Sequence, residues 1–283
     1  MKKKNRVIIL GGGFIASSIK SYLHKKNKPV ILIRKTNIDL SISNELKKLV
    51  NIIKEDDIIF IAAALAPVKN SFMYNYNIKI ANNIFKILKK TKYSKLVYLS
   101  SDAVYSDTLE KINEKSKTLP QSLHGKMHLR REKIFKKLNK AEFVLIRPTL
   151  VYGPNDPHNG YGPNKFIRES KIKGVINLFG KGEENRDHIF IDDLVKIVFK
   201  IIYGKSRGIF NIASGEIISF LKISKIIKQS LKKKIDIIYN TRKGEMPHKG
   251  YRAFNINKIQ KIFKNLKTKK ITTSLIRKLI KEY

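Results

Sequence analysis

The chain has 283 residues, 42% hydrophobic and 9% aromatic, so it can bury a sizeable core and is too apolar for wholesale disorder. It contains no cysteine, which excludes a disulfide framework, a thiolate metal site and a cysteine nucleophile. The 60 Lys and Arg against 22 Asp and Glu give a formal net charge of +38, a balance that attracts polyanions.

The basic residues are scattered along the chain and form no aromatic-interleaved stripe, so we do not expect nucleic acid as the primary partner. No apolar run reaches the roughly 18 residues that span a bilayer, and we expect no membrane span. The apolar stretch from Val7 to Ile19 is broken by three glycines, and no cleavage-site pattern follows it. We interpret it as a strand entering a glycine turn and expect a cytoplasmic location.

Short apolar runs alternate with helical patterns through the first half of the chain. This βαβ spacing predicts an α/β fold, a Rossmann-type doubly wound parallel sheet. The predicted strands are Arg6 to Leu10, Pro29 to Ile33, Asp57 to Ala63, Leu96 to Ser100 and Phe143 to Ile146, with helices from Phe14, over Phe72 to Lys90 and over His124 to Leu138.

The pattern changes after Arg147-Pro148, where residues 153–182 carry most of the prolines and many glycines, as a loop-rich lobe would. Asp192 to Tyr203 is a predicted helix, and Gly208 to Ile212 is a strand that can rejoin the sheet. We therefore expect an NAD(P)-binding Rossmann domain at 1–150 plus about 189–213. A smaller, discontinuous C-terminal substrate lobe would comprise 151–188 and 214–283.

A glycine turn, Gly11-x-Gly13-x-x-Ala16, directly follows the first strand and opens a helix. The first glycine permits the tight turn, the second admits a pyrophosphate, and the helix N-terminus favours its charge. The second strand ends in Arg34-Lys35, where an NAD site usually has an acidic residue for the ribose 2′-OH. Basic residues suit a 2′-phosphate, so NADP is preferred and NAD stays open.

A series of short segments extends this pattern along the chain. They are GGGFIA at Gly11–Ala16, Asp39-Leu40, IFIAAA at Ile59–Ala64, LSSDAVYS at Leu99–Ser106, IRPTLVYGP at Ile146–Pro154, RDHIFIDDL at Arg186–Leu194 and NIASGE at Asn211–Glu216. In this order they resemble the NAD-dependent epimerase/dehydratase family, extended short-chain dehydrogenases/reductases that act mostly on nucleotide sugars.

The resemblance implies roles for the matching positions. Ser101 would be the catalytic hydroxyl that hydrogen-bonds the reacting oxygen. Arg186 and Arg252 would clamp the pyrophosphate of a nucleotide sugar, a contact that suits arginine. Together with the glycine turn and the basic pair, this gives the predicted cofactor-binding residues Gly11, Gly13, Phe14, Ile15, Arg34, Lys35, Asp39, Leu40, Ala62, Ala63, Ala64 and His128. Together with the donors of the loop from Pro154 to Phe166, it gives the predicted substrate-binding residues Ser101, Asp102, Asn164, Lys165, Arg186 and Arg252.

One departure from the family concerns its catalytic Tyr-x-x-x-Lys pair. The matching segment is HGKMHLRRE, so the pair becomes His124-x-x-x-His128, and a spacing of four keeps both side chains on one helix face. Imidazole is a competent acid or base near neutral pH. Histidine acid/base catalysis and a crippled site both remain open. No third ligand stands near the pair, so we expect no metal.

The reaction type is narrowed by Ala103, because sugar dehydratases of this family carry a glutamate base there. We therefore expect an NAD(P)-dependent epimerase or reductase that transfers a hydride at a sugar carbinol or ketone, serving surface polysaccharide synthesis. The alternative is a catalytically impaired Rossmann sensor or binding module. The loop from Pro154 to Phe166 is the expected substrate loop, and Tyr105 and Tyr161 are candidate substitute phenols. The helix from Phe72 to Lys90 is a candidate homodimer surface.

Overall fold

The computed structural model describes residues 5–138, 141–264 and 266–283. The chain divides into two units: unit 1 comprises Met1–Ser106, Glu114–Pro148 and Val195–Asn211, and unit 2 comprises Asp107–Asn113, Thr149–Leu194 and Ile212–Tyr283. Among the described residues, no helix is both long and apolar enough to cross a membrane.

Unit 1 is built on a six-stranded sheet with the order β2-β1-β3-β4-β5-β9. The pairings of β1 with β2 and β3, of β3 with β4 and of β4 with β5 are parallel. The elements are β1 (Val7–Leu10), α1 (Phe14–Lys25), β2 (Val30–Ile33), α2 (Lys47–Ile52), β3 (Ile58–Ile61), α3 (Ser71–Leu88), β4 (Lys95–Leu99), the 3-10 turn η1 (Asp102–Val104), α4 (Leu123–Phe135), β5 (Glu142–Pro148), α6 (Ile191–Tyr203) and β9 (Gly208–Ile212).

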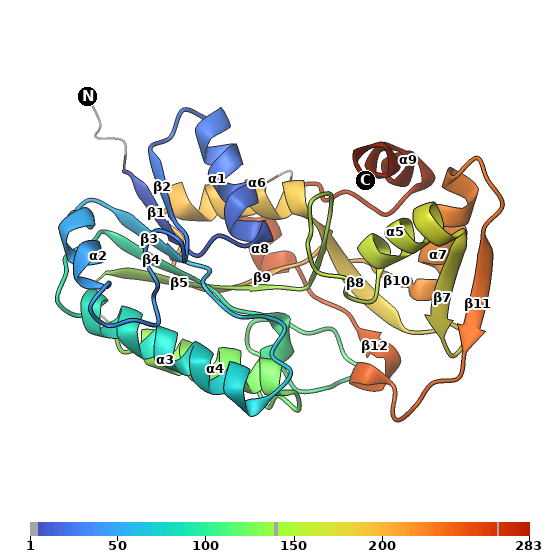
Figure 1. Ribbon diagram of the computed structural model, residues 1–283, viewed down its shortest axis with the longest axis horizontal. Coiled ribbons are helices and arrows are strands. Elements are labelled where there is room, and N and C mark those ends of the chain that lie inside the picture. Colours follow the sequence, from blue (N-terminus) through green and yellow to red (C-terminus); the bar gives the residue numbers. More distant parts are fainter. Residues whose placement is uncertain (1–4, 139–140, 265) are drawn as a thin grey trace. The chain divides into compact units, whose positions relative to one another are not determined.

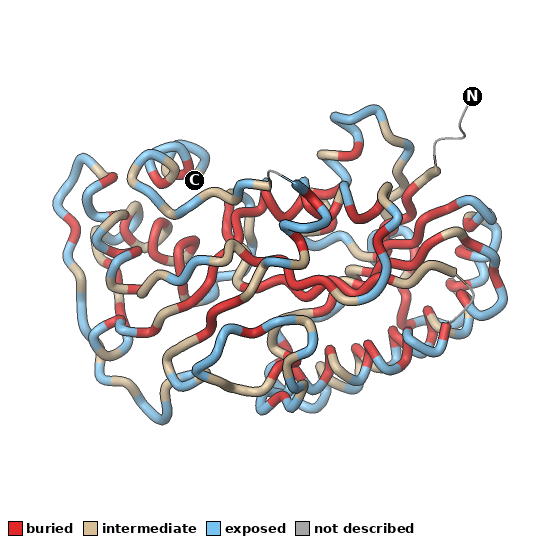
Figure 2. Tube along the Cα trace, turned by 180° about the vertical axis from the view of Figure 1, so that it is seen from behind, coloured by how far each residue is buried: buried red, intermediate tan, exposed pale blue. Residues whose placement is uncertain are grey.

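Helices cover both faces of this sheet. On one face α1 and α6 meet through Tyr22 and Phe199, whose ring centroids are 5.5 Å apart, and α3 and α4 pack side by side on the other (Figure 1). Because both faces are covered, β1 and β3 are buried throughout, as the tube of Figure 2 shows. The predicted Rossmann-type doubly wound sheet is confirmed.

The strand order reverses between β1 and β3, and ligands of such sheets bind at the carboxyl ends of the strands beside that reversal. The loops after β1 and β3 begin there. The second loop is held by Asn77, a buried residue of α3, whose side-chain oxygen accepts from Leu65 N at 2.9 Å and whose amide donates to Leu65 O at 2.9 Å. The α2 helix was not predicted, because its six residues are too few for a clear period.

Unit 2 contains smaller sheets. In one, β8 pairs with β6 and β12 in parallel and with β10 in antiparallel orientation; in another, β7 pairs with β11 in parallel. The helices α5 and α7 pack against each other and against β7. The elements are β6 (Leu150–Tyr152), α5 (Pro163–Lys173), β7 (Val175–Phe179), β8 (Asn185–Phe190), β10 (Ile217–Ser219), α7 (Phe220–Ser230), β11 (Asp236–Asn240), the 3-10 turn η2 (Pro247–Gly250), β12 (Tyr251–Arg252), α8 (Asn257–Ile262) and α9 (Thr273–Glu282).

Candidate functional site

The glycine turn after β1 combines one crowded and one open position. Gly11 has φ +114°, and a Cβ there would lie 2.6 Å from Ala63 N, so only glycine fits beside the strand end. At Gly13, by contrast, a Cβ would meet nothing within 4 Å. Gly11 therefore allows the loop after β1 to pack closely against the loop after β3, whereas Gly13 leaves open space at the start of α1.

The N-terminus of α1 suits an anion. Its N-cap, Gly13, makes no side-chain cap hydrogen bond, and the first turn has no acidic residue. The backbone N–H groups of this turn and the helix dipole therefore favour a negatively charged ligand. Phe14 and Ile15 are half-buried in the same turn. These features are compatible with an anionic group such as the pyrophosphate of a dinucleotide; that this turn binds one stays a prediction.

The two basic residues after β2, Arg34 and Lys35, contact different parts of the structure. Arg34 is exposed, and its side chain lies over the glycine turn, because a Cβ at Gly12 would be 2.8 Å from Arg34 Cγ. Lys35 lies 3.5 Å from the Asp39 carboxylate. Asp39 also accepts from Ser41 N at 2.8 Å and from its hydroxyl at 2.7 Å, and the hydroxyl bond lowers the Asp39 pKa most. Of this pair, Arg34 is thus the side chain that lies against the glycine turn.

The other predicted adenosine-side residues lie at or after strand ends. Leu40 is buried and accepts, at its carbonyl, a hydrogen bond of 3.1 Å from Asn83 of α3. Ala62 donates its backbone N–H to Leu10 O at 2.9 Å, and Ala63 is buried against Gly11. Ala64 is exposed.

Ser101 stands at the carboxyl end of β4 and caps η1. Its hydroxyl accepts from Ala103 N at 3.2 Å and donates to Asp102 Oδ1 at 3.4 Å. The first turn of α4 packs directly on η1, since a Cβ at Gly125 would collide with the Ala103 carbonyl oxygen. A glycine at this position therefore brings the helix that carries the two histidines against the turn that carries Ser101.

His124 and His128 share one face of α4, as their spacing predicted, with ring centroids 4.7 Å apart. Val68 N donates to His124 Nδ1 at 3.4 Å. A backbone N–H can only donate, so Nδ1 is the acceptor and the neutral ring carries its proton on Nε2. Burial lowers the pKa of His124, and the Asp102 charge partly opposes this.

His128 is 5% exposed, and its Nδ1 lies 2.8 Å from the hydroxyl of Tyr98 on β4. Burial lowers the pKa of His128 well below its ordinary value, and His124 and Arg131 lower it further. The ring is therefore neutral at pH 7. Tyr98 and Arg131 were missed from the sequence, although Arg131 stands three residues after His128, a spacing that shares a helix face.

In unit 2 the predicted substrate-loop residues contact one another and nearby elements. Asn164 is buried: its side-chain oxygen accepts from Gly153 N at 3.0 Å, and its amide donates to Asp156 at 2.6 Å. Lys165 lies 3.6 Å from Glu169 on the same helix. The Tyr161 hydroxyl accepts from Phe179 N at 3.0 Å. In unit 1, the buried Tyr105 hydroxyl donates to Asn211 at 2.7 Å. Each of these side chains has a structural hydrogen bond or ion pair.

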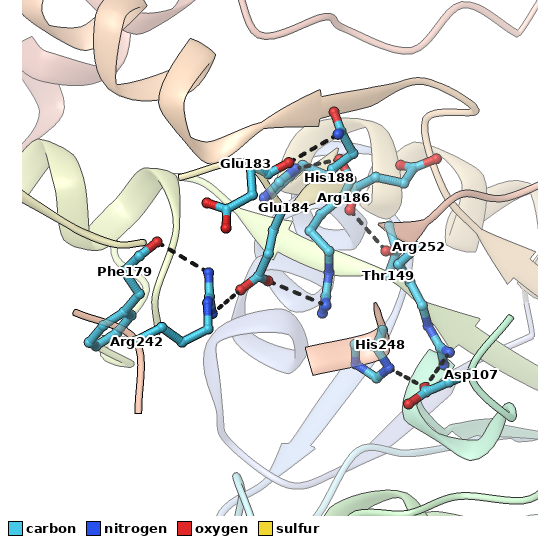
Figure 3. A network of polar contacts seen from close by, with 12 residues as sticks. Asp107, Thr149, Phe179, Glu183, Glu184, Arg186, His188, Arg242, His248 and Arg252 are labelled. Carbon is cyan, nitrogen blue, oxygen red and sulfur yellow. Dashed lines mark hydrogen bonds and ion pairs between the residues drawn. The ribbon is translucent and has the colours of Figure 1, made fainter. Parts of the chain in front are cut away.

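Two arginines of unit 2 share one buried carboxylate (Figure 3). Arg242 Nη1 lies 2.6 Å from Glu184 Oε1, and Arg186 Nη1 lies 3.9 Å from Glu184 Oε2. Arg252 instead lies 3.4 Å from Asp107, which also bonds His248. The structure thus places Arg242 on the carboxylate that Arg186 contacts, and Arg252 on Asp107. No local signal marked Arg242, since it is 58 residues from Glu184 along the chain.

Residues 7–213 match the sequence profile of the "NAD dependent epimerase/dehydratase family". The "Uncharacterized UDP-glucose epimerase YtcB" of Bacillus subtilis is 26% identical over 193 residues, 64% of this chain and 60% of that protein, so this chain spans about 60% of that relative's length. The "Putative UDP-glucose 4-epimerase" of Methanocaldococcus jannaschii is 26% identical over 268 residues, 85% of this chain and 87% of that one. The crystal structure of the UDP-glucose 4-epimerase of Thermus thermophilus in complex with NAD superposes with a TM-score of 0.84 at 20% identity, covering 98% of each chain.

Proposed function

Because this chain belongs to the NAD dependent epimerase/dehydratase family, we propose that it is an NAD(P)-dependent epimerase or reductase of a nucleotide sugar. The observation that carries the proposal is the glycine turn, closed at Gly11 and open at Gly13 beside an uncapped helix N-terminus. Arg34 over this turn supports NADP as the preferred cofactor, because guanidinium groups pair well with phosphate. The modified sugar would serve glycosyl transfer in surface polysaccharide synthesis.

The substrate class is supported by the arginine pair in unit 2. Arg186 and Arg242 both contact Glu184, so the carboxylate keeps two guanidinium groups near each other despite their like charge. Two adjacent guanidinium groups suit a diphosphate, which offers several acceptor oxygens. We propose that this pair binds the pyrophosphate of a UDP-, GDP- or dTDP-sugar. Arg252, bonded to Asp107, would be a supporting residue nearby in the network of Figure 3.

Proton movement falls to residues of unit 1. A bound nicotinamide would supply hydride transfer to or from the sugar carbon. The Ser101 hydroxyl would hydrogen-bond the oxygen on that carbon, and His124 would exchange that oxygen's proton through Nε2. His128, neutral and with Nδ1 bonded to Tyr98, would donate from Nε2–H to a ribose hydroxyl.

A second candidate function, a cofactor sensor without turnover, is favoured by the contact at His124 Nδ1. With Val68 N–H on that atom, the neutral ring presents a proton at Nε2 rather than a lone pair. Accepting a proton at Nε2 would require this contact to break. The double substitution of His124 by Tyr and His128 by Lys separates the two functions. Under the sensor hypothesis, turnover appears only in the double variant.

Ligand binding tests the proposal without an assumed reaction. We would measure the melting temperature of the protein with NADP+, NAD+, UDP, GDP and dTDP, since a ligand of the native state stabilises it by about 2.7 kcal/mol at 100 times Kd. Arg242→Met should weaken nucleoside diphosphate binding by roughly 10- to 100-fold, the value of a charge-assisted hydrogen bond. Arg207→Met is the matched control, because Arg207 is an exposed arginine paired with Glu142. If neither dinucleotide raises the melting temperature, the enzyme proposal fails.

A further inference from the structure

A fully buried arginine stands on α4 beside the two histidines. Arg131 is 0% exposed, its Nη2 donates to the carbonyl oxygen of Ala63 at 2.7 Å, and its Nη1 lies 4.0 Å from the sulfur of Met127. Its guanidinium lies 5.3 Å from the ring centre of Tyr98. Its Nε has no hydrogen-bond partner among the described residues. Arg131 therefore connects the loop behind the glycine turn with the residue that bonds His128.

Within the described ranges, no carboxylate forms an ion pair with Arg131. The adjacent Glu132 points its oxygens elsewhere: Arg147 contacts them at 2.8 and 2.6 Å, and the Ser100 hydroxyl donates to one of them at 2.7 Å. Burial lowers the pKa of Arg131. A buried cation without a carboxylate destabilises a fold, whereas a well-packed apolar side chain would not. A charge at this position therefore calls for a role beyond stability.

The hydroxyl of Tyr98 contacts Nδ1 of His128, the atom that loses its proton when this hydroxyl donates. Tyr98 is fully buried, and burial raises its pKa further above neutrality, so the hydroxyl stays protonated. Its hydrogen bond to His128 Nδ1 at 2.8 Å leaves Nε2–H as the free donor of the ring when the hydroxyl donates. The neutral imidazole then offers one oriented donor and no charge.

We infer that Tyr98 and Arg131 are positioning residues that act through His128 and its surroundings. His128, oriented by Tyr98, supplies the hydrogen-bond donor, and Arg131 supplies the permanent positive charge and holds Ala63 against Gly11. This inference rests on the proposed function, in which the donor serves the cofactor ribose. The contacts run without a break from Gly11 through Ala63 and Arg131 to Tyr98 and His128.

The tautomer of His128 can be read without turnover or cofactor. In the protein with 15N-labelled histidine, two-bond 1H–15N spectra distinguish Nε2–H from Nδ1–H, and the signal lost in His128→Gln assigns the ring. We expect Nε2–H in the wild type at pH 7 and a mixture of tautomers in Tyr98→Phe. A protonated ring or Nδ1–H in the wild type would overturn the inference, whether or not the protein binds a dinucleotide.

The charge of Arg131 is tested by Arg131→Met, with Arg131→Lys as the conservative variant. Arg130→Met is the matched control, because Arg130 is the preceding residue and is exposed. We expect Arg131→Met to change the melting temperature little, because relief of the buried charge offsets the lost hydrogen bond to Ala63 O, while kcat falls at least about tenfold; Arg131→Lys should restore most of the lost kcat. A lower melting temperature with unchanged kcat would show a purely structural arginine and refute the role.

Recording the same 1H–15N spectra over a range of pH tests the effect of the Arg131 charge even if the wild type shows no turnover. The titratable or charged groups that act on His128 or on its neighbour His124 are Tyr98 of β4, Arg131 of α4 and Asp102 of η1. Removing the Arg131 charge should move the protonation midpoint of His128 upward, and Arg130→Met should leave it in place. Equal midpoints in the wild type and Arg131→Met would refute the electrostatic part of the inference.

Discussion

Alanine at Gly11 and alanine at Gly13 should have opposite effects on stability and binding. At Gly11 the added methyl group meets Ala63 N at 2.6 Å and Ala63 Cα at 2.7 Å, on a backbone with φ +114°. At Gly13 it meets nothing within 4 Å, and the backbone there, at φ −70° and ψ −178°, is extended and open to any residue. The two substitutions add the same atom two residues apart in the same turn.

The sizes of the effects follow from these two environments. At Gly11 the backbone strain costs about 1–3 kcal/mol and the overpacking about 1–3 kcal/mol, so we expect a loss of roughly 2–6 kcal/mol and a fall in melting temperature of roughly 5–20 °C. At Gly13 alanine restricts the unfolded chain and should stabilise by up to about 1 kcal/mol. Its methyl group would stand where the pyrophosphate approaches, and a tenfold loss of affinity corresponds to about 1.4 kcal/mol.

Thermal unfolding with and without NADP+ measures both effects in one assay. We expect Gly11→Ala to melt well below the wild type. Without ligand, Gly13→Ala should melt at or slightly above the temperature of the wild type. It should need at least about ten times more NADP+ for the same rise in melting temperature. If Gly13→Ala binds NADP+ as the wild type does, the pyrophosphate does not lie at this turn. If Gly11→Ala melts with the wild type, the packing against Ala63 is not as tight as the geometry indicates.

Three further predictions concern single side chains. His124→Ala should lower turnover at least about tenfold without changing the NADP+ thermal shift, and a fully active variant would remove His124 from the mechanism. In the wild type, reduction needs the protonated His124 ring. Because the pKa of His124 is lowered, the rate of reduction by the wild type should rise as the pH falls below 7. Arg34→Ser should lower the NADP+ to NAD+ affinity ratio at least about tenfold, measured by titration, and an unchanged ratio would place the 2′-phosphate elsewhere. Burial lowers the pKa of His188 from 6.5 to about 3, so the unfolded chain binds the extra proton between these values and stability falls as the pH falls, by up to about 1.4 kcal/mol per pH unit. From pH 7 to pH 5, His188→Gln should therefore lose about 2 kcal/mol less than the wild type in urea unfolding, and equal losses would show that His188 is not buried neutral.

The parallel sheet could be predicted because its signals are local. Strands buried on both faces are continuous apolar runs, and the glycine turn and helix of the first βαβ unit lie within a few residues of one another. The observed strands β1 (Val7–Leu10) and β9 (Gly208–Ile212) lie within the ranges expected from the sequence. The small sheets of unit 2 could not be paired from the sequence, because β8 takes its partners from segments on both sides of it in the chain.

The sequence by itself determined the family, the glycine turn between the first strand and the first helix, and the common helix face of His124 and His128, since each depends on neighbouring residues or on helical spacing. Only the tertiary structure decided which side chains contact one another. It put Arg242 on the carboxylate of Glu184 and Tyr98 on the ring of His128, through contacts between residues far apart in the chain. Burial, which shifts the pKa of a histidine and makes an arginine costly, arises only when distant segments pack together.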